Sequence, residues 1–60
     1  MKKTIGTYTV KLDVNSNLIT ITNKNEMIYG KAFNAHDSGS AYTSICNQVQ
    51  TKVNGANAKS

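Results

Sequence analysis

The feature that most constrains the fold of this chain is a strictly alternating segment near its start. From Tyr8 to Val14 every second side chain is apolar, which places Tyr8, Val10, Leu12 and Val14 on one face. A period of two with aromatic and β-branched residues predicts a β-strand that buries one side. The rest of the chain therefore has to supply a partner strand and a layer that covers the apolar face.

A partner strand follows directly. Residues 15–17, Asn-Ser-Asn, form a turn cluster, because each can bond its own backbone or accept a left-handed conformation. Residues 18–22 then predict a second strand. A two-residue loop at residues 15–16 places the apolar residues of both strands on one face, and a four-residue loop at residues 15–18 preserves those faces. The expected pairs are Leu12 with Ile19 and Val10 with Ile21. The opposite, solvated face carries Thr9, Lys11, Thr20 and Thr22.

A third strand is predicted at residues 28–32, after a turn signal at residues 23–26. Its register has two alternatives that differ by one residue and expose opposite faces. We favour a loop at Lys24-Asn25, because it turns the small residues Gly30 and Ala32 toward the core, where a helix can approach closely. This register directs Ile28, Gly30 and Ala32 inward. It directs Met27, Tyr29 and Phe33 outward, as an apolar patch.

The C-terminal part of the chain predicts one amphipathic helix. Residues 34–39 form a loop, in which Asp37 or Ser38, or Ser40 just beyond it, can cap the helix N-terminus. Asn54-Gly55 predicts its end, with Lys52 in the last turn, where a cation suits the helix dipole. At helical spacing the apolar residues form one stripe. The stripe consists of Ala41, Tyr42, Ile45, Cys46, Val49 and Val53.

Together these elements predict an α+β fold, in which an antiparallel two- to three-stranded β-meander packs against one C-terminal α-helix. The chain of 60 residues is expected to form a single small domain (1–60) with frayed ends at residues 1–4 and 55–60. Such a short chain buries a thin core. Oligomerisation is therefore the expected additional source of stability.

The sequence offers little for catalysis, and we expect no enzyme activity, metal or cofactor. Cys46 is the single cysteine and lies on the apolar stripe, away from a helix N-terminus or a cation that would activate its thiol. His36-Asp37 resembles a base beside its orienting carboxylate, but loop and cap chemistry already explain these adjacent residues. Paired Cys or His ligands for zinc are lacking.

The net charge of +4 is carried by lysine alone, and the seven lysines are dispersed along the chain. Arginine, which makes the bidentate contacts of base and phosphate recognition, is absent. The chain shows no apolar segment long enough for a signal peptide or a membrane span. A lone cysteine fits a reducing compartment. The expected location is the cytoplasm, without membrane or small-molecule partners.

Two hypotheses for function follow. The first is a small protein-interaction module, like the inhibitors and adaptors of phages and mobile elements, which binds a partner protein or a second copy of itself. The alternative is weak, non-sequence-specific binding of RNA or single-stranded DNA, with bases stacked on strand aromatics beside lysines. The first hypothesis uses the outer face of the sheet, an edge strand or the helix, and the second uses the outer face of the sheet. The candidate interaction residues are Met27, Tyr29, Lys31, Phe33 and Lys11.

Overall fold

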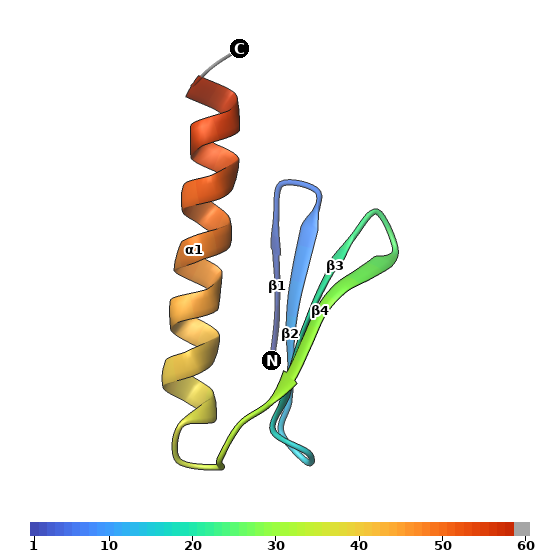
Figure 1. Cartoon of the computed structure of the whole chain (residues 1–60), viewed down its shortest axis with the longest axis vertical. Helices are drawn as coiled ribbons and strands as arrows, with labels where there is room; N and C mark the ends of the chain where they lie inside the picture. The colour runs from blue at the N-terminus through green and yellow to red at the C-terminus, as the bar shows by residue number, and fades with distance from the viewer. Residues whose placement is uncertain (59–60) are drawn as a thin grey trace.

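A computed structural model describes residues 1–58 as a four-stranded antiparallel sheet followed by one helix (Figure 1). The elements are β1 (Lys2–Ile5), β2 (Tyr8–Asp13), β3 (Leu18–Asn23), β4 (Glu26–Ala32) and α1 (Ser38–Ala58). The strand order in the sheet is β1-β2-β3-β4, so each strand pairs with its neighbour in the chain. The α+β meander with a C-terminal helix is confirmed, and it has four strands where two or three were predicted.

The central hairpin has the predicted register. Leu12 lies opposite Ile19 and Val10 lies opposite Ile21, which aligns the apolar residues of β2 and β3 on the face toward the helix. Val10 and Ile19 are fully buried. The prediction for Val14 was wrong: it follows the end of β2, lies in the turn and is 66% exposed.

The first strand was not predicted from the sequence, where residues 1–4 were expected to fray. Residues 2–5 instead form β1, which pairs with β2 and sets Ile5 opposite Tyr8. Gly6 and Thr7 connect the two strands, and the φ of +60° at Gly6 fits the first position of a tight hairpin turn. Ile5 is 4% exposed. The strand is therefore part of the core.

The helix begins where predicted and ends later. The carbonyl of Asp37 accepts a hydrogen bond from the Ala41 amide (2.9 Å), so Asp37 occupies the N-cap position. At the other end the helix continues through Gly55 to Ala58, and the expected stop at Asn54-Gly55 was wrong. Lys52 accordingly lies before the last turn. Of the C-terminal segment expected to fray, residues 59–60 lie outside the described residues.

The core lies between α1 and the first three strands. Its buried residues are Ile5, Val10, Leu12, Ile19, Cys46 and Val49. All six residues of the predicted helix stripe are in this core or pack against it. Figure 1 shows α1 running beside β1 and β2, while the β3–β4 hairpin leans away from the helix toward its tip. The helix thus packs against β1, β2 and β3, and β4 lies beyond it.

Candidate functional site: an open groove between the helix and the β3–β4 hairpin

A β-bulge in β4 decides which side chains face the helix. Lys24 and Asn25 form the predicted two-residue loop, both with left-handed φ angles (53° and 70°). Met27 then lies opposite Thr22, but the next pair joins Tyr29 to Ile21, which leaves Ile28 as the extra residue of the bulge. Beyond it, every residue of β4 faces the side opposite to the one predicted.

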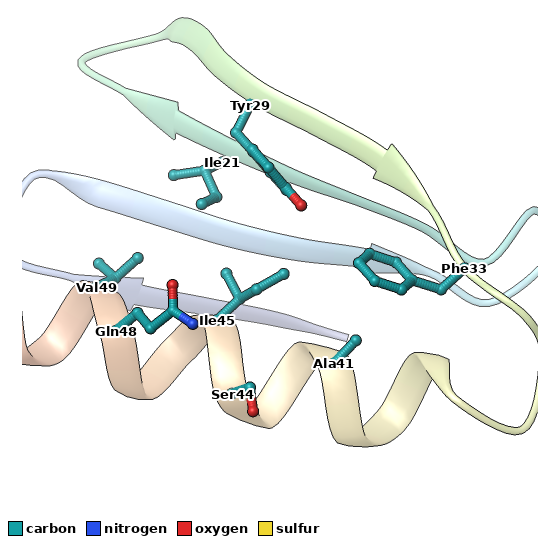
Figure 2. A pocket seen from close by; sticks show the side chains of 8 residues that line it. All are labelled: Ile21, Tyr29, Phe33, Ala41, Ser44, Ile45, Gln48 and Val49. Atoms are coloured by element: carbon teal, nitrogen blue, oxygen red, sulfur yellow. The ribbon is translucent and has the colours of Figure 1, made fainter.

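The predicted division of faces in β4 was therefore wrong for most of the strand. Tyr29 and Phe33 were expected on the outer face, and both point toward the helix (Figure 2). Gly30 was expected inward, but it lies opposite Thr20 on the outer face, next to Met27. The physical reason is the bulge: one additional residue reverses the alternation that follows it.

These side chains line a groove of about 340 Å³ between α1 and the open half of the sheet. Figure 2 shows the two sides, with Tyr29 and Ile21 extending from the hairpin toward Ile45 and Val49 on the helix. The lining is mostly apolar, and Ser44 and Gln48 are the uncharged polar residues of its helical side. The groove forms because α1 packs on β1 and β2 while the twisted sheet carries β4 away from it.

A second, smaller hollow of about 240 Å³ adjoins the groove. It is lined in part by Ile28 and Tyr8, and it shares Ile21, Gln48 and Val49 with the first hollow. Lys52 lies at its border, with Nζ 5.7 Å from the centre of the Tyr8 ring. The bulge residue Ile28 is 52% exposed, so this end of the apolar surface is open to solvent.

The five candidate residues named from the sequence lie on two faces. Tyr29, Lys31 and Phe33 share the helix side, where Lys31 lies opposite the buried Ile19 and its Nζ is 5.2 Å from the centre of the Phe33 ring. Lys11 lies opposite Thr20 and shares the outer face with Met27. The structure therefore brings three of the five together. It adds residues of the helix, among them Ile45 of the predicted apolar stripe and the polar Ser44.

The histidine, cysteine and acidic side chains of the described residues do not converge on the groove. His36 and Asp37 approach each other (Nε2 to Oδ1, 3.6 Å), but both side chains are largely exposed in the loop before α1. Cys46 is buried in the core. Burial raises the pKa of the neighbouring Tyr42 phenol, and the Cys46 thiol raises that pKa further. Tyr42 and Cys46 both belong to the packing between the helix and the sheet.

Within the part of the chain that the structure covers, no group of three or more His, Cys, Asp or Glu side chains could hold a metal ion. Among the same residues, no helix combines the length and apolarity that crossing a membrane requires. Comparison of the chain with models of protein families, with curated proteins and with solved structures finds no match. The groove is therefore the feature of the described residues that bears on function.

Proposed function

We propose that this chain is a protein-interaction module that binds an apolar segment of a partner protein in the groove between α1 and the β3–β4 hairpin. The observation that carries the proposal is the incomplete cover of the sheet. Tyr29 is 37% exposed and Ile28 52% exposed on the same side as the core, so the apolar surface continues beyond the helix. Exposed apolar surface bordered by polar residues is typical of protein-binding sites.

The composition of the groove indicates the kind of segment that fits it. Its walls provide aliphatic and aromatic surface, while Ser44 and Gln48 can hydrogen-bond to the peptide groups of a bound segment. Lys31 lies at the border of the groove, and Lys52 at that of the adjoining hollow. A segment with apolar side chains at its centre and acidic side chains at its ends matches this arrangement and the net charge of +4.

Binding of RNA or single-stranded DNA has less support. A stacking platform needs exposed aromatic faces beside cations. Phe33 is half-buried against the core, and Lys11 lies on the other face of the sheet from Tyr29. A cytoplasmic location remains part of the proposal, because a reduced, buried Cys46 fits a reducing compartment.

The test compares affinity capture by the wild-type chain with capture by two helix variants of equal charge. Ser44→Arg places a long cation in the groove, whereas Asn47→Arg adds the same charge to an exposed position of α1 outside it. Both positions are exposed, so both variants are expected to fold. A protein held by the wild type and by Asn47→Arg, and lost with Ser44→Arg, supports the proposal. Equal capture by both variants contradicts it.

A further inference from the structure

The outer edge of β4 is a second surface that the groove does not use. Within residues 1–58, β4 pairs only with β3, and all seven of its residues are exposed. An edge strand presents unpaired backbone groups that can pair with another chain. The edge carries opposite charges near its two ends, because Glu26 lies near one end and Lys31 near the other.

The bulge gives β4 a symmetric pattern of faces. Opposite residues of an antiparallel pair share a face, so Met27 and Gly30 point outward with Thr22 and Thr20. Ile28 and Tyr29 both point toward the helix, and the remaining inward positions are Glu26 and Lys31. From residue 26 to residue 31 the order is inward, outward, inward, inward, outward, inward. This order is the same when it is read from either end.

That symmetry has a consequence for pairing with an identical strand. When two copies of a strand pair about a two-fold axis perpendicular to the sheet, the residues opposite each other must share a face. In a regular strand successive side chains alternate between faces, so the axis has to lie level with a residue and not between two residues. Here the axis can pass between Ile28 and Tyr29, since both face the same side. Shifting the pairing by one or two residues in either direction brings inward residues opposite outward ones.

We infer that β4 pairs antiparallel with β4 of a second copy of this chain, about a two-fold axis between Ile28 and Tyr29. The resulting pairs, each formed twice, are Glu26 with the second copy's Lys31, Met27 with its Gly30, and Ile28 with its Tyr29. Opposite charges and aliphatic–aromatic pairs are both favourable across strands. Gly30 leaves room for the long Met27 side chain, which already lies near it in the single chain.

The arrangement joins two four-stranded sheets into one and places the two grooves on the same side. It also covers part of Met27 and Ile28, which are 64% and 52% exposed in the single chain. The interface is one strand wide and two chains of charge +4 repel each other, so the dimer is expected to be weak. The inference goes beyond the groove proposal and does not depend on it.

Charge exchange at Glu26 and Lys31 tests this register. Glu26→Lys sets lysine opposite Lys31 at two sites, and Lys31→Glu sets glutamate opposite Glu26 at two sites. Each single variant is expected to weaken the dimer at least about tenfold, and the double variant is expected to restore it. General charge repulsion makes a different prediction: Glu26→Lys raises the net charge and weakens association, whereas Lys31→Glu lowers the net charge and strengthens it.

The measurement is sedimentation velocity from about 10 μM to about 1 mM, the range that defines a weak dissociation constant, under reducing conditions and with circular dichroism to confirm folding. Lys11→Glu is the matched control, because it makes the same charge change on β2, away from the edge. The inference is supported if both single variants dissociate while the double variant and Lys11→Glu associate at least as well as the wild type. A monomeric wild type, a Lys31→Glu dimer as stable as the wild type, or a double variant without recovery overturns it. The capture experiment on Ser44→Arg then still decides the groove proposal separately.

Discussion

The Ile5→Ala variant tests whether β1 belongs to the core, which is the largest difference between the sequence-based expectation and the structure. Ile5 is 4% exposed and packs in the cluster that contains Val10 and Val49. If residues 1–4 frayed, as the sequence suggested, truncating the next side chain would cost little. The variant therefore separates the two descriptions of the N-terminal segment.

The expected cost follows from the atoms removed. Isoleucine to alanine deletes three buried carbon atoms, worth about 2.4 kcal/mol at about 0.8 kcal/mol each. A residual cavity adds to this cost, although β1 is an edge strand and can partly relax into the space. We expect a loss of about 2–3 kcal/mol. A chain of this length has a free energy of unfolding of about 3–9 kcal/mol, so the variant should retain only marginal stability.

Urea denaturation followed by circular dichroism measures the change. With a slope of about 1 kcal/mol per molar urea for a domain of this size, the midpoint should fall by about 2–3 M. Ile5→Val should show a smaller loss, about 0.5–1.5 kcal/mol. Thr4→Ala is the control, because Thr4 is exposed on the same strand. An Ile5→Ala midpoint no lower than that of Thr4→Ala would refute the placement of β1 in the core.

Two further predictions concern the glycines and the alkaline limb of stability. Gly6→Ala should lower the free energy of unfolding by about 1–2 kcal/mol, because Gly6 has a φ of +60° and a Cβ there would lie 3.3 Å from both γ-methyl groups of Val53. Gly39 has open space around it, so Gly39→Ala should raise the free energy of unfolding by about 0.5 kcal/mol, and thermal melts measure both changes. The Tyr42 pKa is raised above 10.0 by burial and by Cys46, so the unfolded chain loses this proton at a lower pH than the native state does. The contribution of Tyr42 to the free energy of unfolding is therefore complete below about pH 10 and is lost as the pH rises through the native pKa. Tyr42→Phe should flatten the decline between about pH 9 and pH 11 in denaturation series, and an unchanged slope would contradict this assignment.

Local sequence patterns predicted the elements in which apolar residues recur at a regular spacing. The β2–β3 register could be predicted because four apolar residues, Val10, Leu12, Ile19 and Ile21, must share one face for either strand to be buried. The helix stripe followed from spacing in the same way. By contrast, β1 offers a single apolar residue, Ile5, before its turn. The available signal was Gly6 at the first position of a two-residue loop between Ile5 and Tyr8.

The groove could be predicted only in part. Tyr29 and Phe33 were candidates for interaction from the sequence but were assigned to the wrong face, because strand periodicity indicates a face only while the alternation is regular. A bulge inserts one residue without a recognisable sequence signature, and Ile28 would suit either side of the sheet. The opposing wall, with Ser44 and Gln48, became part of the site only through the angle between α1 and the hairpin.

The sequence by itself determined the α+β class, the central hairpin and the buried face of the helix, because short-range periodicity encodes which side of an element meets the core. The tertiary structure alone decided the direction of Tyr29 and Phe33 and the extent of sheet that the helix covers. Both depend on packing between segments far apart in the chain: the bulged register packs Phe33 against the core, whereas a regular register would turn it to the outer face. The bulge also gives β4, an edge strand within residues 1–58, its symmetric pattern of faces.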